Sequence, residues 1–126
     1  MADMGKDQIL SKRKRKVVAV ETDDGTFYVR SLRLGEKNRY EAGNYILKGG
    51  KPTLNFDTAD ARLAALVLCD SEGNALFNDL EAAELQHVDA PFLEPALAAA
   101  KKLNGLAGDA ESERKNSPTT LNGASP

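Results

Sequence analysis

The sequence of 126 residues contains one cysteine and no long run of apolar residues. Because Cys69 is alone, an internal disulfide is impossible, and the N-terminus lacks the apolar stretch that a signal peptide carries. Both absences favour a reducing compartment, the cytoplasm. A membrane-spanning helix needs roughly 18 consecutive apolar residues, and no window approaches this length, so the sequence predicts a soluble protein.

The residue types that carry catalysis or bind metals are also sparse. His87 is the only histidine, so a catalytic dyad requires the fold to bring it to Cys69 or to a serine. Cys69 lies on an apolar helical stripe, where a cysteine is more often a small buried side chain than a nucleophile. The loop at 70–74 has oxygen side chains near a glycine, but it lacks the ligand spacing and the distal glutamate of an EF-hand. The sequence therefore predicts no enzymatic activity, no cofactor and no metal site.

Charge is plentiful and unevenly distributed along the chain. Residues 1–50 hold 11 Lys and Arg against 7 Asp and Glu, whereas residues 51–126 hold 6 against 12. A chain with a basic half and an acidic half can associate head to tail with further copies or bind a charged partner. Physiological salt limits the range of interactions between exposed charges to about 8 Å. The chain length fits one domain with a small core.

Two stretches near the N-terminus have the composition of β-strands. Residues 16–21 and 26–30 are rich in β-branched and aromatic side chains, and the Asp24-Gly25 pair between them is a strong hairpin signal. Residues 75–77, with the sequence Ala-Leu-Phe, are too short to stand alone. We expect them to add a third strand to this hairpin.

Two helical patterns follow the hairpin. Residues 34–42 have acids and bases spaced as on an exposed helix, which can continue through 44–47 until the Gly-Gly pair at 49–50 ends it in a loop. A second helix is expected to begin at Asp57, whose side chain can cap it, and to run to Cys69. Both patterns predict helices of ordinary length.

Two shorter helical patterns complete the chain. Asn78 begins a capping box for a short helix that reaches His87. Two prolines place the start of the last helix within 90–94, because proline is tolerated only near a helix start, and the Asn-Gly pair at 104–105 ends it. The elements together predict an α+β fold, an N-terminal β-hairpin with a short third strand packed on about four α-helices.

The composition divides the chain into three parts. Residues 1–15 are polar and basic, with at most one helical turn, and are expected to form a flexible arm. The α+β domain extends over 16–105. Residues 106–126 consist mainly of Gly, Ala, Ser, Asn, Pro and charged residues, so this tail cannot offset its ordering entropy by burial and is predicted to be disordered.

A dense basic run precedes the first strand, and its members are Lys12, Arg13, Lys14, Arg15 and Lys16. Such a run can bind phosphates. It contains no aromatic residue on which bases could stack. A solvent-exposed segment that precedes a strand explains the charges equally well. An acidic protein partner is therefore favoured over nucleic acid.

The helix expected after Asp57 is apolar on two sides. One stripe is formed by Ala59, Leu63, Leu66 and Val67, and the other includes Cys69. A helix of this kind is either enclosed by its own domain or shared with a partner. The candidate partner-binding residues are therefore the second stripe together with the apolar segment before the glycine pair, and the alternative is that all six belong to the core: Ala61, Ala65, Leu68, Tyr45, Ile46 and Leu47.

The order of these elements resembles one protein family. The matching features are the opening at 7–10, the hairpin at 17–29, the segment Gly35 to Glu41, the helix with its turn and apolar triplet at 61–77, and Asn-Gly-Leu at 104–106. With this composite the chain resembles the tail assembly chaperones of long-tailed, siphovirus-like bacteriophages and prophages.

The resemblance implies a non-catalytic protein that binds the tape measure protein, keeps it soluble and helps to recruit tail tube subunits. It also implies a homo-oligomer in the cytoplasm of the bacterial host that is absent from the mature virion, and a possible longer frameshifted form that contacts the tube protein. Two other functions fit the composition. One is a structural tail or connector protein of the virion, and the other is a nucleic-acid-binding regulator that uses the basic run.

Overall fold

The computed structural model describes residues 3–106. Its elements in chain order are α1 (Lys6–Leu10), β1 (Val17–Thr22), β2 (Gly25–Arg30), α2 (Leu34–Ala42), β3 (Tyr45–Lys48), β4 (Lys51–Leu54), α3 (Ala59–Val67), β5 (Leu68–Cys69), the 3₁₀ turn η1 (Asp79–Glu81), α4 (Ala82–Leu85) and α5 (Ala90–Asn104). The predicted α+β class is confirmed. Except for Leu106, the predicted disordered tail lies outside the described residues.

The first hairpin forms as its sequence predicts. β1 and β2 pair antiparallel from Val17 opposite Arg30 to Thr22 opposite Gly25. Gly25 has φ 139°, a value that residues other than glycine rarely adopt. The Thr22 hydroxyl accepts a hydrogen bond from the Asp24 amide at 3.2 Å. The Asp-Gly signal therefore located the turn through the conformation that glycine permits.

The third strand of this sheet differs from the prediction. The strand order is β1-β2-β5, with Val29 opposite Leu68 and Tyr28 opposite Cys69, while Ala75 makes only an isolated bridge to Cys69. The helix prediction through residue 69 was wrong, because α3 ends at Val67 and Leu68 is extended at φ −67°, ψ 126°. Continuing the helix would leave the backbone at the buried Val29 without its strand partner, which is costly.

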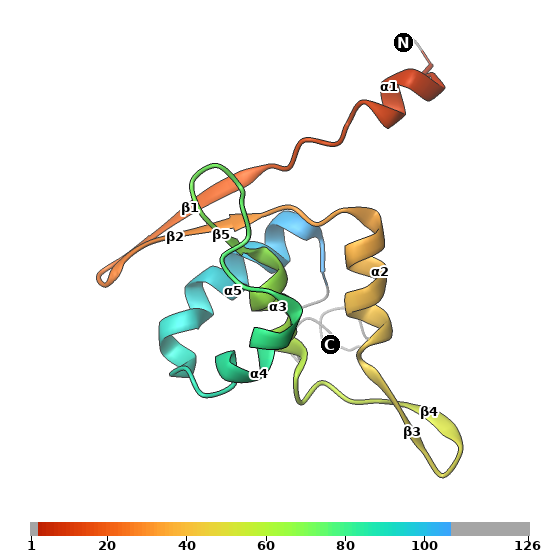
Figure 1. The fold of residues 1–126 in the computed structure, drawn as a ribbon, viewed down its shortest axis with the longest axis vertical. Coiled ribbons are helices and arrows are strands. Elements are labelled where there is room, and N and C mark those ends of the chain that lie inside the picture. Colours follow the sequence, from red (N-terminus) through yellow and green to blue (C-terminus); the bar gives the residue numbers. More distant parts are fainter. Residues whose placement is uncertain (1–2, 107–126) are drawn as a thin grey trace, which may run out of the picture.

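Helix α3 occupies the centre of the molecule, between α2 and α5, with the three-stranded sheet across one end (Figure 1). Leu63 and Val67 are fully buried, and the helix packs close to α5 because many contact positions are alanine. Tyr40 of α2 is buried in this core, whereas Leu34 is exposed. Leu106 also packs against the core, so the domain extends one residue past the predicted boundary.

A second hairpin replaces the predicted continuation of the α2 helix. The structure places Tyr45, Ile46 and Leu47 in β3, which pairs antiparallel with β4. Gly49 and Gly50 have φ 59° and 79°, and two successive positive φ values are typical of a two-residue hairpin turn. The glycine pair therefore closes a hairpin and does not merely interrupt a helix.

Helix ends agree with the sequence in part. Asn78 and Glu81 form the predicted capping box, in which the Glu81 amide donates to Asn78 Oδ1 at 3.1 Å. The helix that they begin is short, η1 and α4, and α5 ends at Gly105 with φ 63° as expected. The predicted cap at Asp57 is wrong, because α3 begins one residue later, after Thr58, which makes no side-chain capping bond.

The base of the second hairpin is fixed by Arg62 of α3. Its guanidinium donates to the Tyr40 carbonyl at 2.9 Å and to the Asn44 side chain, and it lies 5.3 Å from the centroid of the Tyr40 ring. The Asn55 amide donates to the Asn44 carbonyl at 2.6 Å, which joins the two strand ends. Arg62 thus connects α2, α3 and the hairpin, and no sequence pattern indicated this role.

We expect Gly43→Ala to lower the free energy of unfolding by about 1 kcal/mol, because the new methyl group would displace Arg62 from its hydrogen bonds. A Cβ at this position would lie 2.5 Å from the Arg62 guanidinium. Urea denaturation followed by circular dichroism measures the effect. The matched control is Gly35→Ala in α2, where a Cβ meets open space and the substitution should stabilise the protein by about 0.4–1 kcal/mol. Equal stabilisation by both variants would contradict the role of Arg62.

Candidate functional site

One face of the β3–β4 hairpin carries several exposed apolar side chains. Side chains alternate along a strand, and the register places Tyr45 opposite Leu54 and Leu47 opposite Pro52. These four residues therefore share one face, which we call the hairpin apolar face. Leu47 is 77% exposed, and Tyr45 and Leu54 are each 53% exposed. Ile46 is also exposed and lies on the opposite face, beside Thr53.

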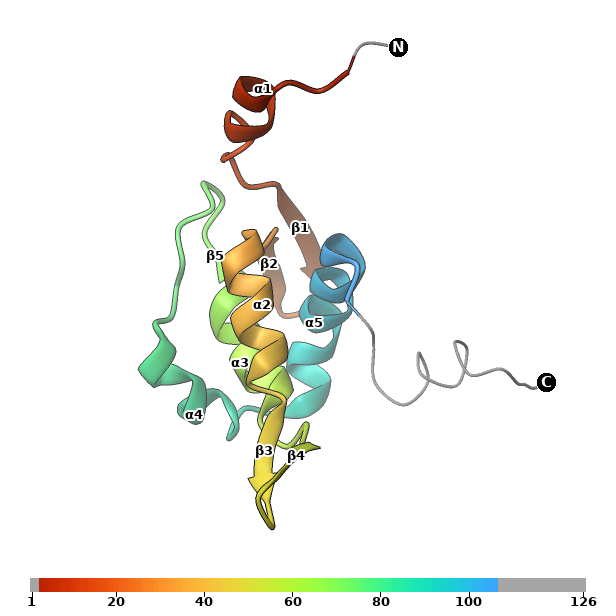
Figure 2. The same cartoon turned by 90° about the vertical axis from the view of Figure 1, so that its right-hand side faces the viewer.

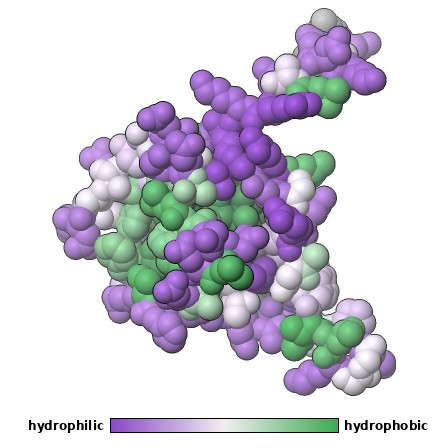
Figure 3. Space-filling view, viewed as in Figure 1, coloured by the Kyte–Doolittle hydropathy of each residue, from purple (hydrophilic) through white to green (hydrophobic). Residues whose placement is uncertain are grey.

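The hairpin projects from the body at the end opposite α1 (Figure 2). In the space-filling view its apolar residues form a separate hydrophobic group at the lower right (Figure 3). An isolated two-stranded hairpin is marginally stable in water, and packing against a helix or further strands stabilises it. A partner that covers the hairpin apolar face would therefore stabilise the hairpin as well as bind it.

The other three predicted contact residues are not available to a partner. Ala61, Ala65 and Leu68 are all buried and belong to the core cluster. The prediction of a free second stripe is wrong, because β5 and the surrounding helices enclose α3 on both sides. Of the six candidates, the structure therefore exposes Tyr45, Ile46 and Leu47 only.

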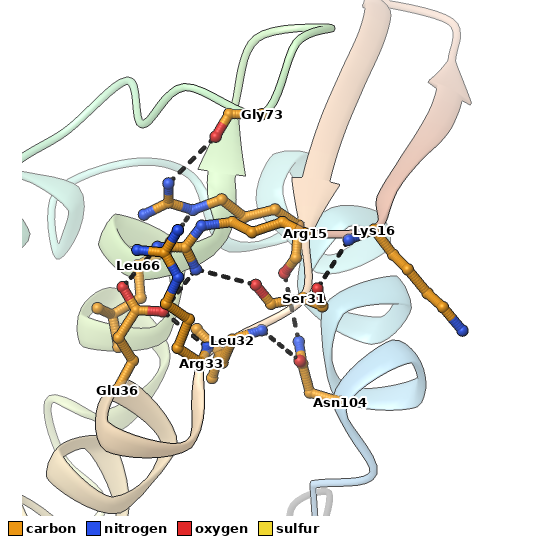
Figure 4. Close-up of polar contacts among 10 residues, drawn as sticks. Arg15, Lys16, Ser31, Leu32, Arg33, Glu36, Leu66, Gly73 and Asn104 are labelled. Atoms are coloured by element: carbon orange, nitrogen blue, oxygen red, sulfur yellow. Dashed lines mark hydrogen bonds and ion pairs between the residues drawn. The ribbon is translucent and has the colours of Figure 1, made fainter. Parts of the chain in front are cut away.

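The basic run does not act as one patch. Lys12, Arg13, Lys14 and Lys16 are exposed, but the Arg15 side chain is 11% exposed and forms a bidentate ion pair with Glu36 at 2.5 and 2.9 Å (Figure 4). Arg15 also donates to the Ser31 carbonyl at 3.1 Å. Assigning Arg15 to a flexible arm or an open phosphate-binding patch was wrong, because this side chain anchors the start of β1.

Glu36 has two partners that act in the same direction. Besides Arg15, it accepts a hydrogen bond from the Arg33 amide at 2.8 Å, which caps the start of α2. The hydrogen bonds from Arg15, followed by the one from Arg33, lower the pKa of Glu36 to about 2. The ionised carboxylate therefore holds together the β1 start and the N-terminal turn of α2.

Arg30 and Asn104 complete the polar network beside this ion pair. Arg30 donates to the Leu66 carbonyl at 2.8 Å and to the Gly73 carbonyl at 3.1 Å, and burial lowers the pKa of its guanidinium. The Leu32 amide donates to Asn104 Oδ1 at 2.7 Å. Asn104 was interpreted only as a helix end, and its second role joins α5 to the segment between β2 and α2.

A cleft lies between the N-terminal segment and the loop after β5. Its volume is about 740 Å³, and the charged residues that line it are Arg13, Lys14, Arg15, Arg30, Arg33 and Glu72. Arg15 and Arg30 already bind Glu36 and backbone carbonyls, and Glu72 adds a negative charge. None of the lining residues is aromatic, so the cleft offers no surface on which bases could stack.

The residues considered for chemistry lie in different settings. Cys69 is in β5, is 2% exposed, and has a thiol pKa that burial raises, so it is not an activated nucleophile. His87 is exposed after α4. Asp70 accepts from the amides of Glu72 and Asn74, which makes 70–74 a turn as predicted.

Residues 3–106 contain neither a metal-binding cluster nor a membrane-spanning helix. No group of three or more His, Cys, Asp and Glu side chains could hold a metal ion there. Within the same residues no helix has both the length and the apolar character to cross a membrane.

Comparison with known proteins finds no matching family model, no matching curated protein and no matching solved structure.

Proposed function

We propose that this protein is a non-catalytic tail assembly chaperone of a long-tailed bacteriophage or prophage. It acts in the cytoplasm of the bacterial host, where it binds the tape measure protein, keeps it soluble and helps to recruit tail tube subunits. The observation that carries the proposal is the hairpin apolar face, which stands clear of the body and presents Tyr45, Leu47 and Leu54 to solvent. The order of sequence elements described above supplies the choice of family.

The geometry of this face suits a helical client. A two-stranded hairpin presents a narrow apolar strip, and the apolar stripe of an amphipathic helix can pack along it. At about 25 cal/mol per Å² of apolar area, covering a few hundred Å² gives several kcal/mol before the costs of association. One subunit binds weakly on this basis, and many copies along an elongated client bind tightly through avidity.

The test is co-expression with the tape measure protein encoded by the same phage. The triple variant Tyr45→Ser, Leu47→Ser, Leu54→Ser should leave the client in the insoluble fraction, because each lost contact removes about 1.5 kcal/mol or more. The affinity for a soluble client fragment should fall by about 1,000-fold or more. The matched control is Leu34→Ser with Leu80→Ser, which removes two highly exposed leucines away from the hairpin and should leave both readouts unchanged.

Two alternative functions are distinguished by separate measurements. Stoichiometric amounts of the protein in purified mature particles, detected by mass spectrometry, would identify a structural tail or connector protein and contradict the chaperone proposal. A nucleic-acid-binding regulator predicts loss of duplex affinity when Lys12, Arg13, Lys14 and Lys16 are replaced by alanine. Arg15 is left intact in that variant, because its removal would disturb the ion pair with Glu36.

A further inference from the structure

A groove that is partly apolar and has an acidic rim lies between the start of α3, α4 and the start of α5. Its volume is about 410 Å³, and the large apolar residues that line it are Phe56, Leu85, Val88, Leu93 and Leu97. Asp57, Asp60 and Glu94 also line it, and no lysine or arginine does. Asp60 forms an ion pair with Lys101, with 3.2 Å between Asp60 Oδ1 and Lys101 Nζ. We call this feature the acid-rimmed groove.

The N-terminal arm, residues 3–14, has the complementary character. Ile9 and Leu10 of α1 are 57% and 49% exposed, and no residue of α1 is buried. After Ser11 the chain continues with Lys12, Arg13 and Lys14, which are exposed. Two apolar side chains beside three cations match an apolar groove beside carboxylates in both hydrophobicity and charge.

The arm is not placed to fill the groove of its own chain. Arg15 is fixed by Glu36, and the Lys16 amide donates to the Ser31 hydroxyl at 2.8 Å. From Arg15, six residues of extended chain reach at most about 21 Å to Ile9. The elements that line the groove, α4 and the starts of α3 and α5, lie at the end of the body opposite the start of β1 in both ribbon views (Figures 1 and 2), and a domain of about 100 residues is roughly 30 Å across. A second copy presents the same groove without this limit.

We propose that the N-terminal arm of one copy docks in the acid-rimmed groove of another. Ile9 and Leu10 enter the apolar floor beside Phe56 and Val88, and the cations at 12–14 lie against Asp57 and Glu94. Because arm and groove are different surfaces, the contact is heterologous, and successive copies can extend into a ring or a filament. The basic half of the chain thus binds the acidic half of its neighbour. This contact does not depend on the identity of the client.

The test uses two full-length variants that damage opposite sides of the contact. The arm variant is Ile9→Asp with Leu10→Asp, and the groove variant is Phe56→Asp with Val88→Asp, all at partly exposed positions. Analytical ultracentrifugation should show concentration-dependent assemblies for the natural protein and monomers for each variant. An equimolar mixture should form a species of two chains and nothing larger, because only one intact arm and one intact groove remain.

The controls separate docking from misfolding. Leu34→Asp with Leu80→Asp places the same charges on exposed sites outside arm and groove and should assemble like the natural protein. Circular dichroism and the urea midpoint check the fold of each variant. If the groove variant loses its unfolding transition, Asp57→Lys with Glu94→Lys replaces it. Mixing that variant with Lys12→Glu, Lys14→Glu should restore the larger assemblies, because the natural and the reversed charge pairs are then both complementary.

Three results would overturn the proposal. They are a monomeric natural protein at every concentration tested, assemblies that persist unchanged in the arm and groove variants, and a mixture of the two folded variants that stays monomeric. Rising salt should also weaken the assembly of the natural protein by about tenfold or more in dissociation constant, since exposed charge pairs are screened. None of these readouts uses the client, so they remain decisive if the chaperone proposal fails.

Discussion

Replacing Leu63 by alanine is expected to lower the free energy of unfolding by about 3 kcal/mol. The Leu63 side chain is 0% exposed and lies on α3, at the centre of the core. Removing a buried leucine loses its transfer free energy and leaves a cavity, which together cost about 2–5 kcal/mol. Since small domains are stable by about 5–15 kcal/mol, the variant should lose a large share of its stability.

Urea denaturation followed by circular dichroism measures this loss. Leu80→Ala is the matched control, because the Leu80 side chain is largely exposed to solvent, and its truncation should change stability by less than about 0.5 kcal/mol. A cost below about 1 kcal/mol for Leu63→Ala would show that α3 does not form the centre of the core.

The second large effect is expected for Glu36→Gln, which should lower the free energy of unfolding by about 2 kcal/mol at pH 7. Glutamine can still accept the Arg33 amide, so the variant removes the charge that pairs with Arg15 and keeps the helix cap. A shift of the pKa from 4.5 to about 2 corresponds to about 3 kcal/mol as an upper limit. Both side chains retain some contact with solvent, which reduces the net value.

The same pair predicts a defined pH dependence. The folded protein holds the pKa of Glu36 below its usual value, so the stabilisation is complete above about pH 5 and is lost as the pH falls from 4.5 toward 2. The difference in urea midpoint between the natural protein and Glu36→Gln should therefore shrink over this range. Glu84→Gln, at an exposed position of α4, serves as the control. A difference that stays constant down to pH 2 would contradict the assignment.

Local chemistry explains which elements the sequence predicted. The first hairpin has Asp-Gly at its turn, and α5 has Pro91 in its first turn and Gly105 at its end. Each signal acts through a backbone conformation that those residues favour, whereas Pro95 lies inside α5, deeper than the sequence predicted. The second hairpin also has a local signal in Gly49 and Gly50. It was missed because the residues at 44–47 were interpreted as a continuation of the helix and the glycine pair as the loop that ends it. Pro52 lies in a two-stranded sheet, where an edge position tolerates it.

The functional surfaces depend on contacts that are distant in sequence. Arg15 and Glu36 are 21 residues apart, and nothing in the basic run distinguishes Arg15 from its neighbours. The apolar stripe at Ala61 and Ala65 has the pattern of a shared helix, and only the tertiary packing of β5 and the surrounding helices shows that it is enclosed. Sequence periodicity thus identified apolar faces, but the tertiary arrangement determined which of them reach solvent.

The position of Cys69 makes its thiol a probe for local opening of the domain. The chain has a single thiol, and it lies in the two-residue strand β5, which holds the end of α3 against the sheet. A thiol-specific reagent can modify it only when this strand detaches or the whole domain unfolds. The labelling rate is therefore a site-specific measure of opening at the junction of helix and sheet, obtained from the natural residue without an introduced probe.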